Sequence, residues 1–120
     1  QPFCPSILIE EKDRLFEKAY NNRHMTCAFK MKNQYRSILP GAIHVDGTSR
    51  VQFVDEKSNK TFYKLLQEVK KRTGFGVVIN TSFNKHGRTI VFTPEDAVID
   101  FLDTNLDFLI IEGYFVEKIK

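Results

Sequence analysis

The first half of the chain carries short blocks of hydrophobic positions that predict strands and one helix. An apolar run predicts a buried strand over residues 6–10, and another strand is predicted over residues 51–54. Between them, residues 24–32 alternate apolar and polar side chains, which is typical of a half-buried strand. Residues 13–20 place apolar side chains at helical spacing, and the two asparagines that follow end the predicted helix.

The second half shows clearer element boundaries. Ser58 or Asn59 caps a predicted helix that ends at Gly74, and a continuous apolar run over residues 77–79 predicts a strand covered on both faces. Thr93 caps a second helix that extends to about residue 102, and strands are predicted over residues 108–111 and 114–119. Strands that alternate with helices predict a single α/β domain with a mixed, twisted β-sheet and flanking helices.

Composition narrows the class of protein. The 120 residues, 42% of them hydrophobic, suit one globular domain, and no apolar run reaches the ~18 residues of a membrane span. The N-terminus lacks the pattern of a secretory signal, so a cytoplasmic location without membrane association is predicted. Two cysteines without a CxxC pair and three histidines without ligand spacing predict neither a disulfide framework nor a metal site.

Charge is distributed unevenly, although the net charge is only +3. Residues 18–45 hold five basic side chains and no carboxylate, whereas residues 89–117 hold seven carboxylates and neither Lys nor Arg. The small net charge argues against nucleic acid as a partner, and RNA binding is the weakest of the functions considered. If the basic segment meets Lys85 and Arg88, the two would attract a compact anion such as a phosphate ester; the alternative is that these cations are simply solvated.

Two polar segments are candidates for the chemistry. Residues 80–88 follow a predicted strand and supply amide, hydroxyl and cationic groups that could hold a phosphate or a nucleotide, although a plain crossover loop would have a similar composition. Residues 44–50 place an imidazole, a carboxylate, a glycine, two hydroxyls and a guanidinium in seven positions. The glycine and Arg50 favour binding of an anion there. A catalytic triad of His44, Asp46 and Ser49 is not expected, because neighbouring residues of an extended segment point to different faces.

The same segments carry a family resemblance. The runs Pro2 to Leu8, His44 to Gln52 (HVDGTSRVQ), Asn80 to Asn84 (NTSFN) and Thr93 to Ala97 (TPEDA) occur in this order. Together they resemble the C-terminal domain of the O-carbamoyltransferases that act on nodulation factors and on antibiotics such as tobramycin and cephamycins. The resemblance covers nearly all of residues 1–120.

The resemblance implies a YrdC-like α/β domain that takes ATP, Mg²⁺ and carbamoyl phosphate and makes carbamoyl adenylate. It also implies an N-terminal domain of the actin and sugar-kinase type, with a metal ion held there, that transfers the carbamoyl group to an acceptor hydroxyl. By motif, Arg50 and Ser82 would be the catalytic residues. The residues assigned to substrate or nucleotide binding would be His44, Asp46, Gly47, Thr48, Arg50, Asn80, Thr81, Ser82 and Asn84.

Two features predict that the chain is one domain of a longer protein. It opens on Gln1 rather than Met, and family members often carry a basic residue at the position of Gln1. We therefore expect the 120 residues alone to be inactive. The alternative function is a non-catalytic module that binds a nucleotide or a phosphorylated metabolite.

Overall fold

In the computed structural model, which describes residues 3–119, strand β1 (Cys4–Leu8) lies at the centre of a three-stranded sheet. Its neighbours are β4 (Gln52–Val54), which runs parallel to it, and β5 (Val77–Asn80), which runs antiparallel. Every residue of β1 is buried. Ile79 of the edge strand β5 is 45% exposed, so the predicted cover on both faces is incomplete there.

Successive residues of the three strands contribute to different apolar clusters, as the pleat of a strand requires. Ile7 belongs to a large cluster on one face, and Leu8 belongs to a smaller cluster with Leu66 on the other. The same alternation holds for the two neighbouring strands. Buried members of the larger cluster are Ile7, Leu15, Phe16, Phe29, Met31, Ala42, Val51 and Phe53. The sheet therefore has a packed layer on each face.

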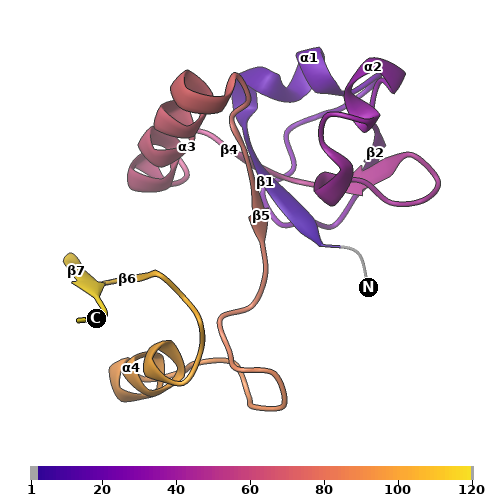
Figure 1. Ribbon diagram of the computed structural model, residues 1–120. Coiled ribbons are helices and arrows are strands. Elements are labelled where there is room, and N and C mark those ends of the chain that lie inside the picture. Colours follow the sequence, from indigo (N-terminus) through magenta and orange to yellow (C-terminus); the bar gives the residue numbers. More distant parts are fainter. Residues whose placement is uncertain (1–2, 120) are drawn as a thin grey trace. The chain divides into compact units, whose positions relative to one another are not determined.

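Helix α3 (Lys60–Thr73) forms the layer over the smaller cluster (Figure 1). Its first turn is capped as predicted, because the Asn59 side chain accepts a hydrogen bond from the backbone N–H of Phe62. Gly74 ends the helix at φ +83°, a left-handed conformation that favours glycine. Both predicted boundaries of this helix are confirmed.

Two predicted elements of the first half are shorter than expected. Helix α1 (Lys12–Leu15) follows a 3-10 turn, η1 (Ile9–Glu11), and the helix predicted over residues 13–20 is wrong beyond Leu15. Phe16 is extended and pairs with Met31 in an isolated bridge. Leaving the helix allows the Phe16 ring to pack edge-on against Phe29 and Phe53 in the core.

The strand predicted over residues 24–32 is reduced to β2 (Ala28–Lys30), although the predicted alternation of burial is present. Strand β2 pairs with β3 (Thr48–Arg50), which lies in a segment that the sequence pattern left unassigned. Buried Val51 is the single residue between β3 and β4, so the chain passes from the β2–β3 strand pair directly into the three-stranded sheet. The short elements α2 (Asn33–Arg36) and η2 (Pro40–Ala42) connect β2 to β3.

Contacts divide the chain into two compact units, Gln1–Thr81 and Ser82–Lys120. The second contains α4 (Pro94–Leu102) and a hairpin of β6 (Phe108–Ile111) and β7 (Tyr114–Glu117). Thr93 and Asp96 form the predicted capping box of α4. Its small core joins Ala97 and Phe101 of α4 to Leu109 of β6.

The predicted α/β class, with a mixed sheet and flanking helices, is confirmed. Among residues 3–119, no helix has the length and apolar character that crossing a bilayer requires.

A buried carboxylate that the sequence pattern did not reveal fastens η1 to α3. Glu11 is 0% exposed and accepts a hydrogen bond of 2.8 Å from Arg14, and it also forms an ion pair with Lys70 of α3. Arg14 donates to the carbonyl of Gly74 at 2.9 Å. A buried charge is costly unless it is paired, so these two cations determine whether Glu11 is tolerated.

We predict that Glu11→Ala lowers the free energy of unfolding of the chain by about 1 to 3 kcal/mol, because it leaves an unfilled site and breaks both pairs. The matched control is Glu17→Ala, at an exposed position, with an expected change within about 0.5 kcal/mol. Urea denaturation followed by far-ultraviolet circular dichroism measures both. Equal stability of the two variants would contradict the role assigned to Glu11.

Candidate functional site

The segment that precedes β3 folds into a closed turn. The Asp46 carboxylate accepts hydrogen bonds from the backbone N–H of Thr48 at 2.9 Å and from its hydroxyl at 2.7 Å. The backbone N–H of His44 donates to the carbonyl of Thr48 at 2.7 Å, and the N–H of Gly47 donates to the carbonyl of His44 at 3.0 Å. Gly47 has φ +82°, so glycine suits this position. We call residues 44–48 the glycine turn.

The glycine turn contains an anchored carboxylate and a partly satisfied imidazole. The bonds from the side chain and then the backbone of Thr48 hold the pKa of Asp46 below its ordinary value. His44 Nδ1 lies 3.4 Å from the Thr48 hydroxyl, whereas Nε2 is buried without a hydrogen-bond partner among residues 3–119. Asp46 therefore stabilises the turn through its two hydrogen bonds from Thr48, which we call the Asp46 brace.

Ser49 has a structural role. It is 0% exposed, and its hydroxyl donates to the carbonyl of Ala42 at 2.5 Å. Its donor is therefore directed to the backbone and not to His44, which agrees with the expectation that no triad forms.

Arg50, at the end of β3, is exposed and is anchored to the central strand. Its Nε donates to the buried Sγ of Cys4 at 3.1 Å. Cys4 is the register partner of Asn80, the last residue of β5. Two of the predicted site residues, Arg50 and Asn80, are thus brought to the same end of β1 from segments 30 residues apart in sequence numbering.

A small polar network orients Asn80. Its Nδ2 donates to the Ser6 hydroxyl at 2.9 Å and to Gln52 Oε1 at 3.2 Å, and Ser6 donates to Gln52 Oε1 at 2.7 Å. The sequence analysis did not assign Ser6, Gln52 or Cys4 to the site. Cys4 and Ser6 lie on β1 and Gln52 lies on β4. Only the strand register therefore shows that they are neighbours of Arg50 and Asn80.

The NTSFN segment spans the boundary between the two units. Asn80 and Thr81 are described with the first unit, and Thr81 is exposed. Ser82 and Asn84 are described with the second unit, where the Ser82 hydroxyl donates to Asn84 Oδ1 at 2.6 Å. The Asn84 amide donates to the carbonyl of Arg88 at 3.1 Å, which closes the loop. The position of Gln1 lies outside the described residues.

Lys85 and Arg88 are paired with carboxylates inside the second unit. Arg88 donates to Asp100 and to Asp103 at 2.6 Å each, and the backbone N–H of Lys85 donates to Asp100 at 2.7 Å. Asp100 is 4% exposed. The hydrogen bond from the Lys85 backbone and then that from Arg88 lower the pKa of Asp100, and the bond from Arg88 lowers that of Asp103. These pairs compensate the cationic charge that the sequence suggested for an anion.

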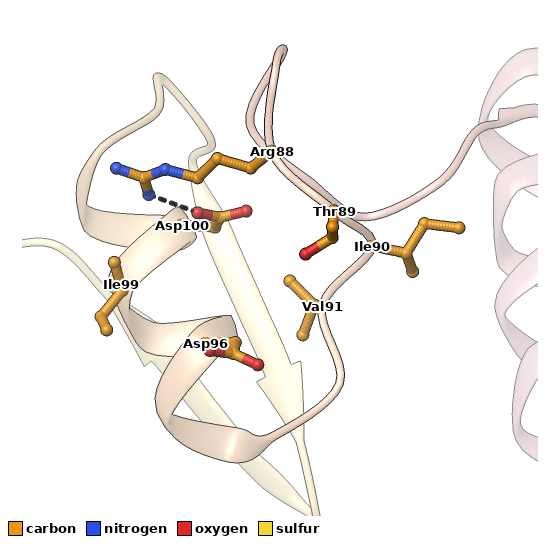
Figure 2. Close-up of a pocket in the computed structure, with 7 residues that line it drawn as sticks. All are labelled: Arg88, Thr89, Ile90, Val91, Asp96, Ile99 and Asp100. Carbon is orange, nitrogen blue, oxygen red and sulfur yellow. Dashed lines mark hydrogen bonds and ion pairs between the residues drawn. The ribbon is translucent and has the colours of Figure 1, made fainter.

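A cavity of about 210 Å³ lies beside this ion pair (Figure 2). It lies between the loop and α4, and its lining residues are Arg88, Thr89, Ile90, Val91, Asp96, Ile99 and Asp100. Figure 2 shows the guanidinium of Arg88 directed at Asp100. Asp96 is held by the cap of α4. The charged side chains of this cavity thus form hydrogen bonds that join the loop to α4 and cap the start of α4.

Among residues 3–119, no group of three or more His, Cys, Asp or Glu side chains is arranged to hold a metal ion. The exposed cation of the candidate site is Arg50, and one of its N–H groups is fixed by Cys4. Fixed donors of this kind bind anions and stabilise charge that develops on oxygen.

Comparison with known proteins identifies the family. The family model for the carbamoyltransferase C-terminus matches residues 1–118. The chain belongs to this carbamoyltransferase C-terminus family. The resemblance noted in the sequence is therefore confirmed, and the match includes both the glycine turn and the NTSFN segment.

Related proteins share almost the whole chain. An uncharacterized protein of Methanocaldococcus jannaschii is 59% identical over 118 residues, which are 98% of this chain and 19% of the relative. The nodulation protein NolO of Bradyrhizobium diazoefficiens is 35% identical over 121 residues, 98% of this chain and 22% of the relative. The 3'-hydroxymethylcephem-O-carbamoyltransferase of Amycolatopsis lactamdurans is 28% identical over 99 residues, 82% of this chain and 19% of the relative.

The carbamoyltransferase C-terminus domain described here thus spans about a fifth of the length of the curated relatives it matches.

The brace formed by Asp46 predicts a pH dependence of the glycine turn. The folded pKa of Asp46 is lowered, so its stabilising bonds are fully present above the ordinary aspartate pKa of about 4 and are lost as the pH falls through the lowered value. We expect the Thr48 amide signal in a nuclear magnetic resonance titration to move with a midpoint below about 4.

The control for this titration is Asp46→Asn, which removes the ionisable group and should abolish the transition at Thr48. A midpoint at or above the ordinary aspartate value would contradict the brace.

Proposed function

We propose that this domain binds ATP and carbamoyl phosphate and forms carbamoyl adenylate, which a second domain of the full-length protein transfers to an acceptor hydroxyl. The observation that carries the proposal is that Arg50 and Asn80 are both tied to the first half of β1, Arg50 by its bond to Cys4 and Asn80 by its bond to Ser6. Membership of the carbamoyltransferase C-terminus family supports the carbamoyl group as the group transferred.

The proposed reaction balances with one water. A carbamoyl oxygen attacks the α-phosphorus of ATP, the bond from that phosphorus to the bridging oxygen breaks, and pyrophosphate leaves. The attacking oxygen belongs to carbamate, which forms when water breaks the phosphorus–oxygen bond of carbamoyl phosphate and releases phosphate. Each carbamoyl adenylate is therefore accompanied by one phosphate and one pyrophosphate. Negative charge increases on the oxygens around phosphorus, where positioned donors lower the barrier most.

In this proposal the residues bind and orient the reactants. The Nε–H of Arg50 bonds Cys4 and orients the guanidinium. The remaining N–H donors of Arg50 then bind a phosphate or carbamoyl oxygen. Asn80 and Ser82 contact the adenylate. The bonds from Thr48 to Asp46 fix the glycine turn, which leads directly into β3 and Arg50. Mg²⁺ would accompany the phosphates of ATP and neutralise part of their charge.

The test uses the full-length protein with ATP, Mg²⁺ and carbamoyl phosphate, followed by phosphorus nuclear magnetic resonance. We expect pyrophosphate and an adenylate signal from the wild type. Loss of one transition-state donor in Arg50→Ala should reduce pyrophosphate formation on the order of 100-fold, and Ser82→Ala should reduce it about tenfold or more.

Matched controls are Arg72→Ala and Ser37→Ala, at exposed positions of the first unit. Both should release pyrophosphate at the wild-type rate. Full turnover by Arg50→Ala would overturn the assignment of Arg50. A wild type that binds ATP and carbamoyl phosphate without ever releasing pyrophosphate would instead favour a non-catalytic binding module.

A further inference from the structure

Arg36, which the sequence analysis did not assign to any site, is connected to the glycine turn by hydrogen bonds through Met31. It is the last residue of α2, and its Nε donates to the carbonyl of Met31 at 2.9 Å. The backbone N–H of Met31 donates in turn to the carbonyl of Gly47 at 3.0 Å. Met31 is 0% exposed, so this connection between Arg36 and the turn is shielded from water.

Arg36 also packs directly on Gly47. A Cβ added at Gly47 would lie 2.7 Å from the guanidinium carbon of Arg36 and 2.7 Å from its Nη1. A Cβ at that distance would displace the guanidinium, so the guanidinium lies where it does because residue 47 has no side chain. The positive φ of +82° is the stronger reason for glycine at position 47, and any side chain there would also move Arg36 away from the turn.

The charge of Arg36 is not compensated by a carboxylate. Arg14, Arg23 and Arg88 each form an ion pair, whereas Arg36 forms none with any residue from 3 to 119. Its Nη2 is buried and has no hydrogen-bond partner in the same part of the chain. A partly buried guanidinium without a counter-ion raises the positive potential of the turn that it touches.

We propose that Arg36 is a positioning residue for anion binding by residues 44–50. It holds the glycine turn through Met31 and Gly47, and its charge strengthens the attraction of the segment for a phosphoryl anion. The inference rests on the proposed function in that carbamoyl phosphate is taken as the anion. It goes further by assigning a role to a residue outside both motifs.

Electrostatics gives the expected size of the effect. A unit charge on the order of 10 Å from an anion, at an effective dielectric constant of about 20, changes affinity about tenfold. A purely structural role would give no such dependence on the charge at position 36. The test therefore compares variants that separate the charge of Arg36 from its planar shape.

The experiment measures the dissociation constant of carbamoyl phosphate for the full-length protein by isothermal titration calorimetry. Arg36→Gln keeps a planar polar head without the charge and should weaken binding about tenfold. Arg36→Lys keeps the charge without the plane and should remain within about threefold of the wild type. Arg72→Gln is the matched control for loss of an exposed arginine and should bind as the wild type does.

Thermal unfolding of each variant reports the folded fraction, so the dissociation constants are compared for folded protein only. Equal binding by Arg36→Gln and Arg72→Gln would overturn the proposal, and so would a lysine variant as weak as the glutamine variant. If the wild type binds carbamoyl phosphate, Arg36→Gln binds it more weakly and no pyrophosphate forms with ATP, the role of Arg36 stands and the adenylation reaction fails. A wild type that does not bind carbamoyl phosphate would overturn both.

Discussion

Burial of β1 on both faces, together with pairing on both of its edges, is the constraint on which the first unit depends. Its apolar residues Ile7 and Leu8 fill two separate clusters, so neither face can lose its cover without exposing part of the core. Ser6 is 0% exposed and must therefore find hydrogen-bond partners inside the protein. Those partners are Gln52 and Asn80 on the two neighbouring strands, and this requirement places Asn80 at the candidate site.

The same strand orients the cation of the site. Cys4 is buried at the start of β1 and accepts from Arg50, so a soft and weakly hydrated sulfur fixes the guanidinium without neutralising it. A carboxylate at this position would have formed a strong ion pair and reduced the affinity of Arg50 for an external anion. The second unit shows the contrasting case, because Asp100 and Asp103 compensate Arg88 there.

Much of the fold could be predicted from the sequence where local signals coincide with tertiary structure. The caps at Asn59 and Thr93 and the stop at Gly74 act within one helical turn, so the local sequence suffices to identify them. The helix predicted over residues 13–20 failed because the Phe16 ring packs better in the core from an extended backbone than from a helix. Tertiary packing overrides local periodicity in such cases.

The two candidate loops remain predictions from sequence, chosen because glycine, hydroxyl and amide groups are dense in them. The structure adds that Arg50 bonds Cys4 and that Cys4 is the register partner of Asn80. The roles of Cys4, Ser6 and Gln52 follow from strand register, which no single segment encodes. Arg36 was missed because nothing in its own neighbourhood distinguishes it from a solvated arginine, and only its approach to Gly47 does so.

The chemistry that these residues offer is positioning without proton transfer. Asp46 is held ionised by Thr48, Ser49 donates to a backbone carbonyl, and Glu11 is committed to Arg14 and Lys70. Arg50 keeps guanidinium N–H groups beyond the one that bonds Cys4. Under the proposed adenylation, such a cation would supply the charge stabilisation and alignment that a leaving pyrophosphate needs more than a base.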